Sequence, residues 1–217
     1  MRIAVLGTGT VGTTLASGFV RTGHEVRLGS RTAGNEKSVA WVAETGAGAS
    51  EGSFADAASW GEVVVNATGG LVSIEALTAA GAENLAGKPL LDASNPLDFS
   101  GGFPPTVSQP DGRSLAEQIQ ASFPAARVVK TLNTMSASVM VHPRSLPGAH
   151  TVFVAGDDAD AKAVAADLLR GFGWAPGEIV DAGGIGAARG LELYLPLWLS
   201  LMGSFGTPEF NVSVIRA

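Results

Sequence analysis

The chain has 217 residues, of which 46% are hydrophobic and 16% charged, with a net charge of −6 and no cysteine. This length suits one domain, or one domain with a small appendage, and the apolar content argues against disorder. The lack of cysteine excludes disulfide scaffolds, thiolate metal sites and cysteine nucleophiles, and the negative charge disfavours nonspecific binding to nucleic acid.

Neither a secretory signal nor a membrane span is expected from the apolar segments. Only residues 3–6 form an apolar run before Gly7, which is shorter than a signal peptide requires. The strongest apolar run covers residues 191–202, whereas a spanning helix needs about 20 residues. We therefore expect a cytoplasmic protein without a membrane partner.

In chain order, short apolar segments with little polar alternation predict strands that helices cover on both faces. The strand candidates are residues 3–7, 25–28, 62–67, 89–92, 127–131, 151–155 and 179–181, with a weak one at 47–49. The helix candidates are residues 11–22, 53–60, 72–85, 115–123 and 157–172. This alternation predicts an α/β fold of the Rossmann type, with a doubly wound, mostly parallel sheet.

Two stretches depart from the alternation. Residues 95–111 carry glycine and proline pairs and predict a long ordered loop, a kind of segment that is often functional. From Gly183 the chain contains one apolar helix and a tail, so we divide it into a Rossmann domain, 1–182, and a small C-terminal helical element, 183–217. Because the helix at 191–202 is apolar nearly all round, it must be buried, either in the domain or between two subunits.

A glycine-rich turn follows the first predicted strand and opens the first predicted helix. It matches the G-x-G-x-x-G pattern, and this strand–turn–helix context favours a dinucleotide site over an ordinary turn. Free N–H groups at the start of the helix would bind the pyrophosphate. The predicted residues are Gly7, Thr8, Gly9, Thr10, Val11 and Gly12.

The end of the second strand selects the cofactor. NAD-selective sites place an acid there for the ribose 2′-hydroxyl, but this chain has Ser30 and Arg31, and no acid before Glu36. A guanidinium and a hydroxyl would bind a 2′-phosphate through charge-assisted hydrogen bonds. The sequence therefore predicts NADP rather than NAD, with a solvated surface arginine as the alternative.

Three later loops follow strands and should meet at the same edge of the sheet. They contribute Thr68 and Gly69, then Asn95, then Asn133 and, four residues on, Ala137. Such hydroxyls, amides and backbone groups can position a nicotinamide but cannot readily perform acid–base catalysis. We therefore expect no catalytic side chain, and chemistry that the bound cofactors supply.

Other possible functional motifs are weak in this sequence. The three histidines, His24, His142 and His150, lack metal-ligand spacing, so no metal site is expected, and no G-x-S-x-G elbow occurs. Residues 183–189 could form a second anion-binding turn with Arg189 as counter-charge, but simple entry into a helix is the preferred interpretation.

Taken together, these motifs resemble the NADP-dependent oxidoreductases that use coenzyme F420, over essentially the whole chain. The resemblance rests on the glycine turn, Gly-Ser-Arg at 29–31, Lys-Thr-Leu-Asn-Thr at 130–134, and Asp-Ala-Gly at 181–183 before a helix with Leu-Pro-Leu at 195–197. The flavin-using reductase domains of the STEAP metalloreductases are similar relatives.

The resemblance implies a homodimer that exchanges hydride between NADPH and F420. We expect the C-terminal apolar helix to form the dimer contact, and FMN or FAD to be the alternative acceptors. The resemblance places residues 8–11 at the pyrophosphate, Ser30 and Arg31 at the 2′-phosphate, and Ala137 by the nicotinamide. The chain departs from the archaeal pattern at Asn133, where that pattern has histidine, and at residues 69–70, where it has Ile-Pro.

Two other functions fit the glycine turn. One is an NADPH-dependent reductase of a small carbonyl or imine, which would need a proton donor and, in similar folds, a larger helical domain. The other is a non-catalytic module that senses NADP(H).

Overall fold

A computed structural model of the chain describes residues 1–216. One eight-stranded sheet has the order β10-β9-β8-β5-β4-β1-β2-β3, and all neighbours are parallel except β8 and β9. The strands are β1 Arg2–Leu6, β2 Glu25–Ser30, β3 Ala49–Ser53, β4 Val63–Asn66, β5 Pro89–Asp92, β8 Arg127–Thr131, β9 Val152–Ala155 and β10 Ile179–Gly183. The predicted mostly parallel, doubly wound sheet is confirmed.

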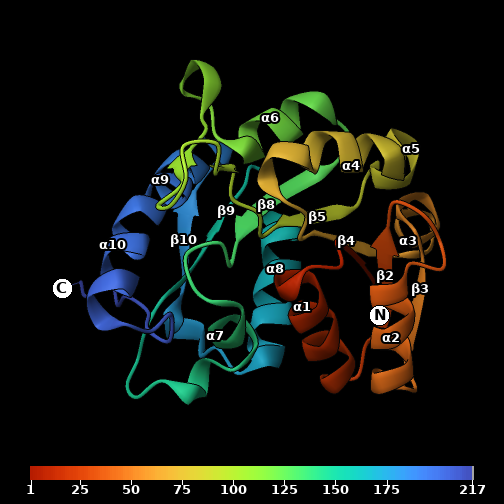
Figure 1. Ribbon diagram of the computed structural model, residues 1–217, viewed down its shortest axis with the longest axis horizontal. Helices are drawn as coiled ribbons and strands as arrows, with labels where there is room; N and C mark the ends of the chain where they lie inside the picture. The colour runs from red at the N-terminus through yellow and green to blue at the C-terminus, as the bar shows by residue number, and fades with distance from the viewer. Residues whose placement is uncertain (217) are drawn as a thin grey trace.

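Helices cover both faces of the sheet, with α1, α2, α7 and α8 on one face and α3 to α6 on the other (Figure 1). The helices are α1 Thr10–Arg21, α2 Glu36–Thr45, α3 Phe54–Trp60, α4 Ser73–Ala80, α5 Ala82–Leu85, α6 Leu115–Ser122, α7 Ala137–Val141, α8 Ala159–Phe172, α9 Ala188–Leu193 and α10 Leu195–Phe205.

Strand β1 shows how the sheet separates two hydrophobic cores. Ile3 and Val5 pack into the core beneath α1 and α8, whereas Ala4 and Leu6 pack into the core beneath α3, α4 and α6. Because successive strand residues point to opposite faces, a strand covered on both sides is expected to be apolar at most of its positions. This is why β1 reads as a continuous apolar run after Arg2 in the sequence.

Several local details differ from the sequence-based prediction. Helices α2 and α7 lie where no helix was expected; α2 is capped by Asn35, whose side chain accepts a hydrogen bond from the Lys37 amide. The expected helix at 72–85 is broken at Gly81, which has a positive φ of 91° and separates α4 from α5. The expected loop at 95–111 includes a short hairpin of β6 Leu97–Asp98 and β7 Thr106–Val107.

The last two helices, α9 and α10, leave much of their apolar surface uncovered. Leu195 is the buried residue of α10, while Leu197 and Phe205 are 55% and 56% exposed. Of the two expected arrangements, the first is therefore wrong: among the described residues, α10 is not buried within the domain. Within residues 1–216, no helix is both long and apolar enough to cross a membrane.

Candidate functional site

The glycine turn after β1 has the geometry that close chain approach requires. Gly7 has a φ of +117°, and a Cβ on it would lie 2.5 Å from the Ala67 carbonyl oxygen. A Cβ on Gly12 would lie 1.9 Å from the Gly7 carbonyl oxygen, so α1 packs directly on the turn. Gly9 faces open space, with no heavy atom within 4 Å of its would-be Cβ. Two glycines are thus needed for packing, and the third leaves room for a ligand.

The start of α1 has free donors. Its N-cap, Gly9, offers no side-chain hydrogen bond, and the first turn contains no acidic residue. By contrast, α3 and α6 begin with capping boxes built on Ser53 and Ser114. Uncapped N–H groups at the positive end of a helix dipole form an anion-binding site. The donor set at this turn therefore fits a pyrophosphate.

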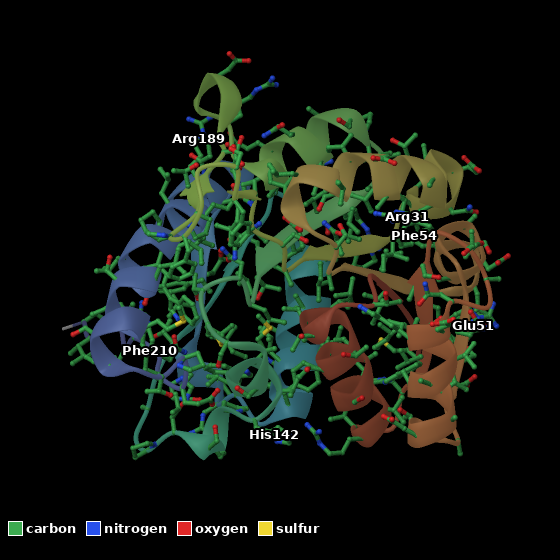
Figure 2. The ribbon with its side chains drawn as sticks, in the orientation of Figure 1. Arg31, Glu51, Phe54, His142, Arg189 and Phe210 are labelled. Atoms are coloured by element: carbon green, nitrogen blue, oxygen red, sulfur yellow. The ribbon has the colours of Figure 1, made fainter. Side chains whose placement is uncertain are left out.

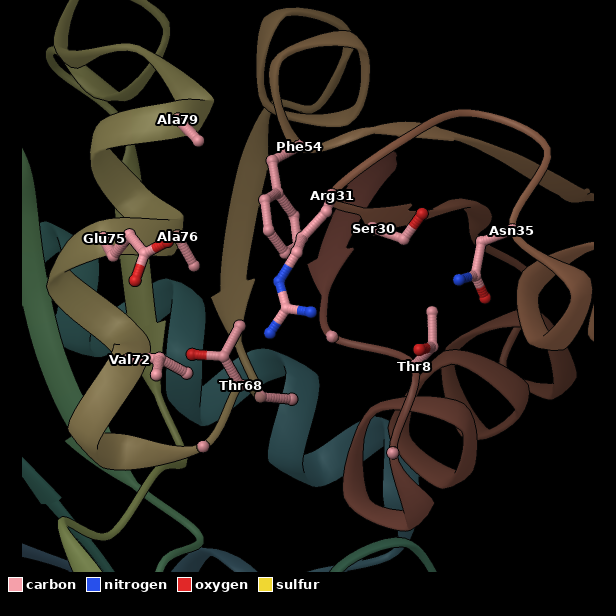
Figure 3. A pocket seen from close by; sticks show the side chains of 14 residues that line it. Thr8, Ser30, Arg31, Asn35, Phe54, Thr68, Val72, Glu75, Ala76 and Ala79 are labelled. Carbon is pink, nitrogen blue, oxygen red and sulfur yellow. The ribbon is translucent and has the colours of Figure 1, made fainter.

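A cavity of about 500 Å³ lies at the carboxyl ends of β1, β2 and β4 (Figure 3). Arg31 extends into it, beside the ring of Phe54 and toward Thr68 (Figure 3). The lining includes seven of the residues predicted to bind the cofactor: Gly7, Thr8, Gly9, Ser30, Arg31, Thr68 and Gly69.

Ser30 contributes differently from Arg31. Its side chain is buried, and its hydroxyl donates a 2.6 Å hydrogen bond to the Thr32 carbonyl. This bond shapes the turn that presents Arg31, which is itself exposed. The oxygen of Ser30 remains able to accept a hydrogen bond, while the guanidinium is the positive group at this end of the cavity.

Sequence reasoning missed one wall of this cavity. Phe54 begins α3, and one face of α4 supplies four further residues. These four residues are spaced three and four apart, as residues on one face of a helix are. The sequence shows that spacing, but no motif connects it with the glycine turn. The α4 residues are Val72, just before the helix, then Glu75, Ala76 and Ala79.

A second cavity of about 270 Å³ adjoins the first, because Ala67, Thr68 and Gly69 line both. It reaches from the glycine turn to the C-terminal helix α10. Its lining combines apolar and neutral polar groups, and none of the described residues that form it is ionisable. The remaining lining residues are Val11, Gly70, Ala93, Ser94, Asn95, Leu97, Phe99, Asn133, Met135, Met140, Leu195 and Trp198.

Asn95 and Asn133 form a reciprocal pair in the second cavity. The Asn133 amide nitrogen donates to the Asn95 side-chain oxygen at 2.9 Å, and the Asn95 amide donates to the Asn133 carbonyl at 2.8 Å. Asn133 also donates to the Leu191 carbonyl of α9 at 3.0 Å. Its own side-chain oxygen is buried without a hydrogen-bond partner among the described residues. The predicted loops after β5 and β8 do meet, and they hold α9.

Three predicted residues lie outside both cavities. Gly12 is buried in the packing described above, and Thr10 is exposed at the first position of α1. Ala137 is half-buried at the first position of α7. A direct contact of these residues with a cofactor stays a prediction.

Behind the cavities lies a buried charged network that the sequence motifs did not identify. The Lys130 ammonium lies 2.8 Å from Asp92 and 2.9 Å from Glu192, and all three side chains are fully buried. Burial alone would lower the pKa of Lys130, but the two carboxylates outweigh it and raise that pKa. Asp92 in turn accepts a hydrogen bond from Asn66, which contacts Thr68 in the cavity wall. The network connects α9 with the site.

The second anion-binding turn considered for residues 183–189 is not supported, because the Ile185 amide at that turn already donates a hydrogen bond to the Asp157 carboxylate. Arg189 instead makes a two-pronged ion pair with Glu117 of α6, with distances of 2.7 and 2.5 Å. Figure 2 shows Arg189 far from Arg31, and His142 at the opposite end of the molecule from both. Among the described residues, no group of three or more His, Asp or Glu side chains could hold a metal ion.

The strand order, the glycine turn and the cavity at the carboxyl edge define a dinucleotide-binding protein of the Rossmann class. A sequence profile described as NADP oxidoreductase, coenzyme F420-dependent, matches residues 2–96. A crystal structure from Arthrobacter sp. FB24, provisionally named an F420-dependent NADP-reductase, is 51% identical, with 100% of each chain covered and a TM-score of 0.94. The chain belongs to this family of NADP-dependent oxidoreductases, as its motifs predicted.

More distant structures share the fold. The protein SMa0349 from Sinorhizobium meliloti is 24% identical, over 100% of this chain and 96% of that one, with a TM-score of 0.74. An imine reductase from Myxococcus stipitatus is 18% identical, over 94% of this chain but 63% of its own, with a TM-score of 0.66. A search of curated proteins found no match.

Proposed function

We propose that this chain transfers hydride between NADPH and a flavin-type acceptor, with coenzyme F420 as the leading acceptor. The observation that carries the proposal is the pair of adjoining cavities: one has the donors for a phosphorylated dinucleotide, and the other has no ionisable lining among its described residues. The family supports both the cofactor and the acceptor.

The first cavity supports NADPH through separate groups of this chain. The uncapped start of α1 and the open Gly9 would hold the pyrophosphate, while Arg31 would bind the 2′-phosphate with a charge-assisted hydrogen bond. Thr68 and Gly69, shared by both cavities, would lie where the nicotinamide half passes from one to the other.

The second cavity supports an acceptor that needs no proton from the protein. Reduction of a carbonyl or imine requires a general acid within hydrogen-bond reach, and the described lining residues offer hydroxyl, amide and indole groups instead. When bound, a flavin or deazaflavin supplies the hydride chemistry itself, and this chain's residues bind, orient and exclude water. Asn95 and Asn133 would orient the reacting rings, and Leu195 and Trp198 would cover them.

We further propose that residues 1–182 bind the dinucleotide and that residues 183–217 shape the acceptor side. The exposed apolar face of α10, with Leu197 and Phe205, is the surface we assign to a homodimer contact. An apolar surface of this kind on a soluble protein is typical of an interface.

The proposal is tested by mixing the protein anaerobically with NADPH and F420 and following F420 absorbance. We expect NADPH-dependent reduction of F420, and little reduction with NADH because NADH lacks the 2′-phosphate. Parallel mixtures with FMN and FAD identify the acceptor. Failure with all three acceptors would refute hydride transfer to a flavin. NADPH oxidation with a small imine or carbonyl would then support a substrate reductase, and NADPH binding without any turnover would support a sensing module.

A further inference from the structure

The α4 wall of the first cavity carries one charged side chain. Val72, Glu75, Ala76 and Ala79 share one helical face that lines the cavity, and Glu75 is the acid among them. Figure 3 shows Glu75 on the opposite side of Arg31 from Thr8 and the glycine turn. The carboxylate therefore lies beyond the position expected for the 2′-phosphate, at the end of the cavity farthest from the pyrophosphate site.

The walls around Glu75 suit a flat ring. Phe54 lines the cavity with a nearly buried phenyl ring, and Ala76 and Ala79 line it with single methyl groups, which leave room beside α4. Aromatic and apolar walls with one polar group at the edge are the usual surroundings of a bound heterocycle. This part of the cavity thus has walls suited to a base and one group that could recognise its edge.

The chemistry of that group is selective. An ionised carboxylate accepts hydrogen bonds and cannot donate them. Glu75 is an exposed residue in the cavity lining, so its carboxylate is open to a ligand. A purine with an exocyclic amino group can donate to it, whereas one with a carbonyl at the same position would oppose it with a second acceptor.

We propose that Glu75 determines base specificity by accepting a hydrogen bond from the 6-amino group of adenine. This inference rests on the proposed binding of NADP(H), because it assigns the adenine end of that cofactor. Arg31 would distinguish the phosphorylated ribose and Glu75 the base, so two residues on opposite walls of one cavity would recognise two chemical features. A carboxylate that can pair with an amino group but not with a carbonyl discriminates between the two bases by the free energy of that hydrogen bond.

The test uses NADPH and its hypoxanthine analogue, in which a carbonyl replaces the 6-amino group. Dissociation constants are measured by fluorescence titration for the wild type, Glu75→Gln and Glu83→Gln. Glu83 is the matched control because it is an exposed glutamate on the neighbouring α5 and lies outside the cavity lining. Melting temperatures verify that each variant is folded.

We expect the wild type and Glu83→Gln to prefer NADPH by about tenfold or more, the range of one hydrogen bond to a charged group. In Glu75→Gln the preference should fall below about threefold, because an amide can accept from an amino group or donate to a carbonyl. Equal binding of both dinucleotides by the wild type, or an unchanged preference in Glu75→Gln, would overturn the role of Glu75 alone. A wild type that binds neither dinucleotide would overturn the proposed function as well.

Discussion

The Lys130 ammonium on β8 and the Glu192 carboxylate on α9 lie 2.9 Å apart, and both side chains are fully buried. Glu192 also accepts hydrogen bonds from the Leu115 and Ala116 amides at the start of α6. One carboxylate therefore joins the sheet, α6 and the C-terminal helices. Because α9 leads into α10, which forms part of the second cavity, this ion pair fixes a wall of the site from within the protein.

Lys130→Met should lower the free energy of unfolding by about 3–5 kcal/mol, because it leaves two buried carboxylates without their counter-charge. Urea unfolding measures this change. Arg2→Met is the control, since the Arg2–Glu62 pair is about half exposed and its loss should cost at most about 1 kcal/mol. If the two variants lost similar stability, the buried network would not be holding the fold together.

Arg31→Glu should weaken NADPH binding by about 1.5–3 kcal/mol, the range of a hydrogen bond to a charged group, and affect NADH much less. The reason is that the guanidinium is assigned to the 2′-phosphate. Fluorescence titration of both cofactors measures the effect. Lys37→Glu makes the same charge reversal on an exposed residue of α2 outside the cavity lining, and should change both affinities little. Equal losses for NADPH and NADH in Arg31→Glu would show that the residue is misassigned.

Two alanine substitutions in the glycine turn should have separable effects. Gly12→Ala places a Cβ 1.9 Å from the Gly7 carbonyl oxygen and should reduce stability by about 1–3 kcal/mol, as overpacking does. Gly9→Ala has room in the free protein and a φ of −78°, so its melting temperature should stay close to the wild type. Its NADPH affinity should nevertheless fall, because the methyl group enters the space assigned to the pyrophosphate. Unchanged NADPH binding in Gly9→Ala would contradict that assignment.

Acid stability should depend on Glu117. Its ion pair with Arg189, together with hydrogen bonds from Ser114, lowers the pKa of its carboxyl from 4.5 to about 2. A depressed carboxyl pKa contributes stability that is present above about pH 4.5 and is lost as the pH falls toward about 2. Arg189→Gln should therefore lose less stability over this interval than the wild type. Urea unfolding between pH 2 and pH 6 measures it, and identical slopes would show that the ion pair does not control the titration.

The proposed dimer contact predicts a change in molecular mass. Leu197→Glu combined with Phe205→Glu should convert a wild-type dimer into a monomer, because charges would replace apolar side chains at the contact. Sedimentation equilibrium measures the mass, and Thr78→Glu, at an exposed position on α4, serves as the control. A monomeric wild type would exclude the dimer directly.

The order of strands and helices was predictable where a local signal exists. Ser53 and Ser114 cap α3 and α6, and a continuous apolar run is enough to indicate a strand covered on both faces. Helices α2 and α7 were missed: α7 is a five-residue helix, and neither begins with a signal as clear as these capping boxes. The antiparallel pairing of β8 with β9 leaves no trace in either strand's composition, because both strands are largely buried on both faces whichever way they pair.

The sequence by itself determined the dinucleotide turn, the arginine at the end of β2 and the family, because these depend on residues that are close together in the chain. Only the tertiary structure decided which distant residues complete the site. Phe54 and Glu75 come to the cavity through the packing of α3 on α4, and Lys130 meets Glu192 through the return of the C-terminal helices to the sheet. Such contacts depend on how surfaces pack, which no local spacing encodes.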